Sequence, residues 1–232
     1  FHLEENRLYL KAGKQIFVLD VSTKHIVHSY PIDFSKLHKV ALLKTADHMY
    51  IAGVGVKGYE VYKIESTNSV SLIDSGNING SSIINHHDGL CWIGDVDGNI
   101  HYYDAKESKF IYSSQVSRAV VSGISYLSES KLIISGETNQ LYEFDIYAKS
   151  CTDSIVLTST PFNAPVKLLL TPYIDVDSTL WVGSDGQGVL FHNFNKTQFK
   201  HYLGSTNGTK SASVIKIFQQ GDKSFITLNR KG

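Results

Sequence analysis

A repeat of about 42 residues constrains the fold of this chain more than any other feature of its sequence. Short apolar runs recur, and their central residues are 41, 42, 42, 47 and 44 residues apart: Tyr9, Tyr50, Trp92, Ile134, Trp181 and Phe225. Most of these runs lead into a glycine. A period of this length is typical of repeat architectures, in which each unit buries its apolar surface against its neighbours.

Each period contains three further segments. After each apolar run comes an alternating segment that ends in an Asp or Asn, as at Asp20, Asp104, Asp145 and Asn195. Asp and Asn side chains accept hydrogen bonds from backbone a few residues further on, so they begin turns. A third strand and a polar loop follow, and then a fourth apolar strand, at 40–43, 82–84, 123–126, 166–170 and 214–218.

Four strands per period, with no helical periodicity of 3.6 residues, predict an all-β chain: a β-propeller of four-stranded antiparallel blades. Dividing 232 by 42 gives about 5.5 blades in a single segment, 1–232, with blade periods starting near 8, 49, 91, 133, 180 and 224. We expect the chain to enter at the second strand of its first blade. We also expect it to be part of a larger propeller, seven-bladed and in a tandem array in one variant of this prediction. The alternative is an unusual closure, in which the last inner strand completes the first blade.

Residues 180–226 resemble a known family. A Leu-Trp-Val-Gly strand at 180–183 leads into a glycine-rich hairpin, and then come Lys-Thr-Gln-Phe-Lys-His-Tyr at 196–202 and Ser-Val-Ile-Lys-Ile at 213–217. This order resembles the two-component regulator propeller repeat. The blade around Cys91-Trp92-Ile93-Gly94 matches it moderately, and the first two blades match only in spacing.

The resemblance implies that the chain lies in the periplasmic sensor region of a hybrid two-component histidine kinase, an inner-membrane protein. Such regions detect polysaccharide breakdown products or similar nutrients and signal to a kinase, which is not among these 232 residues. The resemblance also allows a homodimer formed through the intact sensor.

The charge balance excludes several partners. The chain has 22 Lys and Arg against 22 Asp and Glu, so its formal net charge is zero. A nucleic-acid binder carries a basic surface, and a membrane-bound protein needs a long apolar span or a strongly amphipathic face. We therefore expect neither nucleic-acid contact nor membrane insertion by this chain.

Three motifs suggest chemistry that their surroundings do not support. The glycines of 53–58 match the dinucleotide-binding pattern, but a strand-like segment follows where that site needs a helix. Asp95 and Asp97 begin like a calcium loop that lacks its glutamate, so a plain turn is favoured, with weak calcium binding left open. His86 and His87 are adjacent, and in a strand their side chains would diverge.

The sequence contains no recognisable catalytic motif and no paired-carboxylate pattern. We therefore expect no enzyme activity and no cofactor or metal in this chain. Cys91 occupies an apolar repeat position and is expected to be a small buried hydrophobe. A propeller enzyme would need clustered acid–base or cofactor groups near its central channel, and the inner strands show none clearly.

We therefore expect a ligand-sensing module that binds a small molecule or oligosaccharide; the alternative is a protein–protein interaction scaffold. In a propeller, the loops from the outer strand to the next inner strand share a face with the loops between the second and third strands. By loop position alone, the candidate ligand contacts on that face are Lys57, Asn79, Asp95, Asp97, Arg118, Asp185, Gln187 and Asn207.

Overall fold

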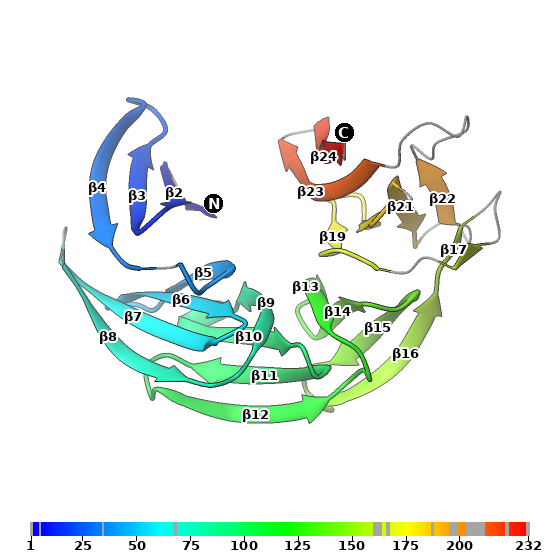
Figure 1. The fold of residues 1–232 in the computed structure, drawn as a ribbon, viewed down its shortest axis with the longest axis horizontal. Helices are drawn as coiled ribbons and strands as arrows, with labels where there is room; N and C mark the ends of the chain where they lie inside the picture. The colour runs from blue at the N-terminus through cyan, green and yellow to red at the C-terminus, as the bar shows by residue number, and fades with distance from the viewer. Residues whose placement is uncertain are drawn as a thin grey trace. The chain divides into compact units, whose positions relative to one another are not determined.

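The structure confirms the all-β repeat. The computed structural model describes residues 2–4, 6–33, 35–66, 69–159, 164–165, 168–186, 188–194, 199–202, 212–220 and 223–230. Within these ranges five sheets have four antiparallel strands each, in sequence order, as in the blades of a β-propeller (Figure 1). The chain divides into two compact units, 1–95 with 100–114, and 96–99 with 115–232, which are described separately.

The first unit contains three blades. The first blade consists of β1 (His2–Glu4), β2 (Arg7–Ala12), β3 (Gln15–Asp20) and β4 (His25–Pro31). The second consists of β5 (Lys39–Lys44), β6 (Met49–Gly55), β7 (Gly58–Ser66) and β8 (Ser69–Gly76). The third consists of β9 (Gly80–Asn85), β10 (Leu90–Asp95), β11 (Asn99–Asp104) and β12 (Lys109–Gln115), with a 3₁₀ turn, η1 (His87–Gly89), between β9 and β10.

Strand β6 explains why the apolar runs are nearly continuous. Successive side chains of a strand point to opposite faces of the sheet. Tyr50, Ala52 and Val54 pack into a core shared with Cys91 and other residues of the third blade. Ile51, between them, packs into a second core shared with the first blade. Both faces of the second blade are therefore covered by its neighbours.

The second unit contains the remaining strands. The fourth blade consists of β13 (Val121–Ser128), β14 (Lys131–Gly136), β15 (Gln140–Asp145) and β16 (Ser150–Val156). The fifth consists of β19 (Tyr173–Ile174), β20 (Thr179–Ser184), β21 (Gly188–Asn193) and β22 (Phe199–Tyr202). Two further pairs are β17 (Thr158–Ser159) with β18 (Ala164–Pro165), and β23 (Ala212–Gln220) with β24 (Lys223–Arg230).

A core between the fourth and fifth blades holds this unit together, with Ile133 and Leu141 on one side and Leu180 and Val182 on the other. The two tryptophans of the repeat make equivalent cross-strand pairs. Trp92 stacks on Tyr102 of β11 with ring centroids 4.3 Å apart, and Trp181 stacks on Phe191 of β21 at 5.1 Å. These aromatic pairs stabilise the register between the second and third strands of a blade.

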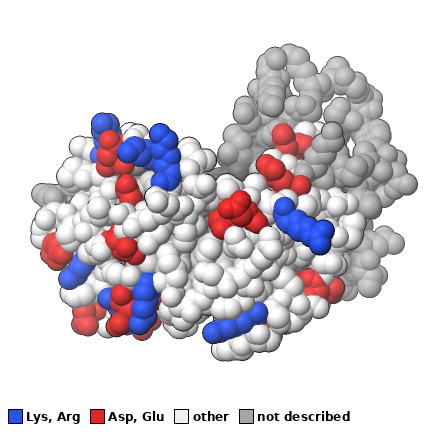
Figure 2. Space-filling model, turned by 60° about the horizontal axis from the view of Figure 1, so that its bottom comes forward, with Lys and Arg blue, Asp and Glu red and all other residues white. Residues whose placement is uncertain are grey.

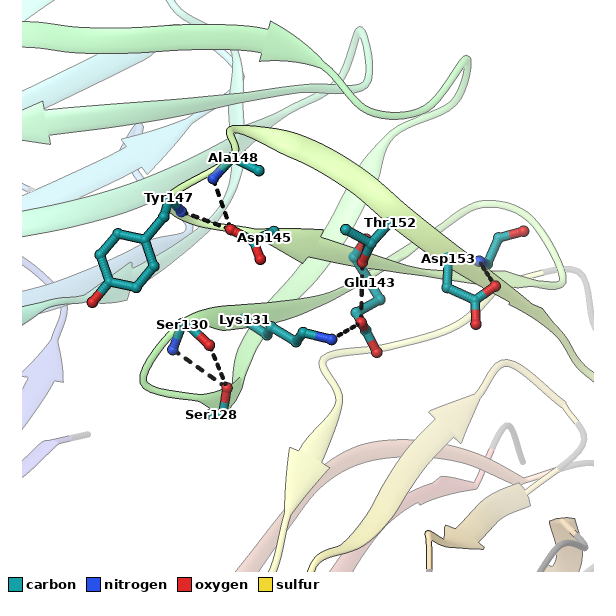
Figure 3. Close-up of polar contacts among 10 residues, drawn as sticks. Ser128, Ser130, Lys131, Glu143, Asp145, Tyr147, Ala148, Thr152 and Asp153 are labelled. Carbon is teal, nitrogen blue, oxygen red and sulfur yellow. Dashed lines mark hydrogen bonds and ion pairs between the residues drawn. The ribbon is translucent and has the colours of Figure 1, made fainter.

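The turn after the third strand has the chemistry that the sequence predicted. Asp20, Asp104 and Asp145 each accept a backbone N–H from two or three residues further on, at 2.7–2.9 Å. Figure 3 shows Asp145 holding the N–H groups of Tyr147 and Ala148. The fourth residue after each aspartate has a positive φ: 59° at Lys24, 49° at Ser108 and 53° at Lys149.

One expected strand position is wrong, and a second is matched only in part. The chain does not enter at a second strand, because β1 pairs with β2 as a short inner strand of the first blade. The inner strand of the fifth blade was expected at 166–170, of which 168–170 are described. These residues do contact the end of β20: Leu169 bridges to Ser184, and the N–H of Leu170 donates to the Gly183 carbonyl at 2.8 Å. The two-residue strand β19 pairs with β20 further on. Pro172 lies between these two contacts and has no N–H to donate to the sheet.

The surface charge and the burial of Cys91 agree with the sequence analysis. On the face that Figure 2 shows, Lys and Arg lie among Asp and Glu over the described surface, as expected for a net charge of zero. Cys91 is fully buried, and Cys151 of β16 is exposed. In the described residues, no helix has the length and apolar character needed to cross a membrane.

Candidate functional site

An open polar hollow of about 490 Å³ lies in the second unit. Its walls come from the loop between β12 and β13 and from the hairpin between β14 and β15. These are the two kinds of loop that the sequence analysis assigned to the binding face. The hollow is lined by Gln115, Val116, Ser117, Arg118, Thr138, Gln140 and Tyr142.

Backbone hydrogen bonds fix the loop that carries Arg118. The N–H groups of Val116 and Ser117 both donate to the carbonyl of Gly98, at 2.9 and 3.1 Å. The N–H of Ala119 donates to Ser117 Oγ at 3.1 Å, and Ser117 is itself buried. These bonds close the turn on both sides of Arg118.

Gly98 permits this close approach. Its φ is +86°, and a Cβ on it would lie 2.2 Å from the carbonyl oxygen of Ser117. Only glycine adopts such a backbone readily and leaves room for the neighbouring carbonyl. The hairpin tip at 96–99 therefore acts as the support of the loop.

The opposite wall is the start of β15. The N–H of Gln140 donates to Thr138 Oγ1 at 3.2 Å, which closes the hairpin. Tyr142 Oη donates to Gln140 Oε1 at 2.9 Å. Residues two apart in a strand lie on the same face, so the Gln140 amide and the half-buried Tyr142 ring are presented together.

The electrostatics of the hollow rest on one group. Arg118 is exposed and is the one charged residue among the described residues that line it. The other polar groups are two amides, two aliphatic hydroxyls and a phenol. Amides and hydroxyls both donate and accept hydrogen bonds, so this surface suits a ligand that also does both.

The other predicted contacts are scattered. Lys57, in the turn between β6 and β7, and Asn79, before β9, are exposed in the first unit. Asp97 is exposed in the hairpin tip, and its carbonyl accepts a hydrogen bond from Gln115 Nε2 at 3.4 Å. Asp185 is exposed between β20 and β21. Gln187 and Asn207 lie outside the described residues.

Asp95 is a buried residue and not an exposed loop contact. Its Oδ2 lies 2.9 Å from His101 Nε2, and His101 Nδ1 lies 2.8 Å from Ser113 Oγ. Serine hydrolases use the same three residue types. Ser113, however, does not line the hollow at Arg118 or the second hollow, near Lys106. We therefore interpret the three residues as a structural hydrogen-bonded contact that joins β10, β11 and β12.

The two adjacent histidines do not diverge as predicted. His87 begins η1 and does not continue the strand, so its ring lies 3.9 Å from that of His86, centroid to centroid. His86 Nδ1 is 2.9 Å from Tyr102 Oη, and burial, followed by His87, lowers the pKa of His86. No group of three or more potential metal ligands occurs among the described residues, those around Asp95 and Asp97 included.

A second hollow, of about 440 Å³, lies in the first unit among loops of the other kinds. Its lining includes Asp47, His48, Lys63 and Lys106. Lys106 Nζ pairs with Asp88 at 2.7 Å, and Lys63 Nζ pairs with Glu65 at 3.6 Å, so both lysines already have acidic partners.

Sequence reasoning found Arg118 but missed its neighbours Thr138, Gln140 and Tyr142. They lie on the next hairpin along the chain, and the repeat did contain a usable signal. In a propeller, the loop entering a blade and the hairpin between that blade's second and third strands share a face. A polar Thr-x-Gln-x-Tyr run at that hairpin could have been paired with Arg118.

A scan against protein-family models and a search of curated proteins found no match to this chain.

Proposed function

We propose that this chain is a non-enzymatic, extracytoplasmic ligand-sensing propeller that binds a carbohydrate. The observation that carries the proposal is the hollow at Arg118, where two glutamine amides, two hydroxyls and a tyrosine ring meet. Its volume falls within the range of small-molecule sites, roughly 300–1,000 Å³. Its loop is held in place by backbone hydrogen bonds before any ligand arrives.

A saccharide matches this lining in two ways. Each sugar hydroxyl is both a donor and an acceptor, and the amides of Gln115 and Gln140 offer both functions from one side chain. The sugar ring also has an apolar C–H face that can lie on the Tyr142 ring, whose amphipathic character suits such contacts. The lining contains no carboxylate or imidazole among its described residues, so it offers no acid–base pair for glycoside hydrolysis.

The resemblance to the two-component regulator propeller repeat supports a signalling role for this binding event. We propose that the chain belongs to the periplasmic region of a hybrid two-component sensor, with the ligand biasing the arrangement of propellers and thereby a kinase elsewhere in the protein. A ligand can shift such an equilibrium only by its difference in affinity for the two states.

A thermal-shift screen of the 232-residue chain against monosaccharides and oligosaccharides, with calcium and EDTA as controls, tests the proposal. A saccharide present at a hundred times its Kd should add about 2.7 kcal/mol of stability. Gln140→Ala should reduce the shift, and Ser75→Ala, an exposed change in the other unit, should leave it unchanged. If a folded chain shows no shift with any saccharide, the interaction scaffold becomes the better explanation.

A further inference from the structure

We infer that the preferred ligand is an acidic saccharide, whose carboxylate binds the guanidinium of Arg118. This inference rests on the proposed function, because it names the class of sugar that the same hollow takes. Three observations carry it: the charge state of the lining, the absence of a partner for Arg118 within the described residues, and the fixed geometry of its loop.

The first observation concerns the charges around the hollow. Arg118 is the one charged residue among the described residues of the lining. Two acidic residues, Asp97 and Glu137, belong to the flanking hairpins and are exposed, but neither lines the hollow. A bound ligand therefore meets one positive charge and no negative charge in the described lining.

The second observation is that Arg118 makes no ion pair or side-chain hydrogen bond with any described residue. In the same blade, Lys131 pairs with Glu143, as Figure 3 shows. Arginine presents five N–H donors in a planar fork that matches a carboxylate with two parallel hydrogen bonds. The guanidinium can thus receive an anion without first releasing a partner in the described part of the chain.

The third observation is that hydrogen bonds hold the backbone of the turn that carries Arg118 on both sides of this residue. Before Arg118 in the chain, the N–H groups of Val116 and Ser117 donate to the Gly98 carbonyl. After Arg118, the N–H of Ala119 donates to Ser117 Oγ. The N–H of Glu137 also donates to the Val120 carbonyl, at 3.3 Å, which ties the loop to the β14–β15 hairpin. A preorganised donor loses less entropy on binding, and this favours affinity.

These contacts divide the ligand into two parts. The carboxylate lies against Arg118, and the ring hydroxyls face Gln140, Thr138 and Gln115 across the hollow. A neutral saccharide makes the second set of contacts only, and at Arg118 it offers hydroxyls in place of a carboxylate. Charge-assisted hydrogen bonds are roughly twice as strong as neutral ones, so the acidic sugar should bind more tightly.

Isothermal titration calorimetry of the 232-residue chain tests this inference with three matched sets of short oligosaccharides: galacturonate and glucuronate, the neutral sugars of the same linkage, and sulfated neutral sugars. We expect the uronates to bind at least about tenfold more tightly than the neutral set, a difference of about 1.4 kcal/mol. Arg118→Gln should remove that preference while keeping residual binding of both sets. Arg118→Lys should keep part of it, because the charge remains but the fork is lost.

Arg7→Gln is the matched control, since Arg7 is an exposed arginine of β2 in the other unit and its loss changes the net charge equally. Equal affinity for uronates and neutral sugars, or a preference that Arg118→Gln leaves intact, would overturn the acidic-sugar inference and leave the proposed function standing. Tighter binding of the sulfated set would overturn the choice of a carboxylate. If no saccharide of any set binds, the proposed function fails together with the inference.

Discussion

The Nε2 atom of His101 lies 2.9 Å from Oδ2 of Asp95, and both side chains are at least nine-tenths buried. Asp95 ends β10 immediately before the hairpin tip that supports the Arg118 loop. His101 lies on the next strand and continues the contact to Ser113 on β12. Three strands of the third blade are therefore joined by side chains as well as by the sheet.

We predict that His101→Ala destabilises the chain by about 2–3 kcal/mol, because it removes the partner of a buried carboxylate oxygen. Ser113→Ala should cost less, about 1 kcal/mol, since Ser113 is exposed and water can replace its hydroxyl. Urea denaturation of both variants measures the difference. If both variants lose the same free energy of unfolding, the burial of the Asp95–His101 contact does not determine how much that contact stabilises the chain.

Because of the buried hydroxyls of Tyr59 and Tyr103, we predict that the chain becomes less stable at alkaline pH. Both donate to Asp74 Oδ2, at 3.0 and 2.7 Å. Burial, and then the contact with Asp74, raises the pKa of Tyr59 from 10.0 to about 12 and raises that of Tyr103 as well. A raised pKa in the folded state gives stability that is complete below pH 10 and is lost as the pH rises towards 12.

The matched variant is Tyr59→Phe, which keeps the ring and its edge contact with Phe110 but cannot ionise. The urea midpoint is measured below pH 10 and again near pH 12. The decrease between these two pH values should be smaller for this variant than for the unmodified chain. A parallel fall in both would place the alkaline sensitivity at other tyrosines.

Asp145 is predicted to stabilise the turn after β15. Asp145→Ala removes the acceptor of two backbone N–H groups, at 2.9 and 2.7 Å, and should cost about 1 kcal/mol. The control is Asp153→Ala on the next strand, where the carboxylate contacts the N–H of its own neighbour, Ser154, and little change is expected (Figure 3). Thermal melts of the two variants distinguish a specific turn contact from a general effect of losing a surface charge.

Gly98 offers a prediction that links stability to binding. Gly98→Ala places a Cβ 2.2 Å from the Ser117 carbonyl, so the loop must move and Arg118 moves with it. We expect a loss of more than about 1 kcal/mol and weaker saccharide binding. Gly13→Ala is the control: Gly13 also has a positive φ, +58°, but its Cβ would meet no atom within 4 Å.

Only backbone strain, of about 1–2 kcal/mol, is expected for Gly13→Ala, with binding unchanged. Calorimetric titration of both variants with the saccharide that stabilises the unmodified chain measures this. If Gly98→Ala binds with unchanged affinity, the loop does not need its present backbone position for recognition.

The strands that the sequence predicted well are those with a strong period. The Trp92 and Trp181 runs are mostly buried on both faces and recur at similar spacings of 41–47 residues, so pattern alone located β10 and β20. Strand β1 has only three residues, too few for any pattern to be read. The inner strand expected at 166–170 was located in part: residues 168–170 contact β20, and β19 begins beyond Pro172, which has no N–H to donate to the sheet.

The site was predicted less completely, because a position in the repeat does not give a side chain's direction. Arg118 and Asp95 both belong to binding-face loops in the repeat, yet one is exposed in a hollow and the other is buried against His101. The side chains opposite Arg118 come from a hairpin about twenty residues away in the chain. The repeat assigns both loops to one face, but the distance between their side chains also depends on the packing of the loop on Gly98, which the spacing does not give.

The two cysteines differ in exposure, so a spectroscopic probe can be attached to the chain at one of them. They are the only thiols in the sequence; Cys91 is enclosed in the core between two blades, and Cys151 lies open on β16. A maleimide fluorophore should therefore attach at a single position without any engineered residue. Cys151 is paired with Phe144 of β15, the strand that also carries Gln140 and Tyr142, so the dye would lie on the blade whose other end carries the proposed ligand contacts.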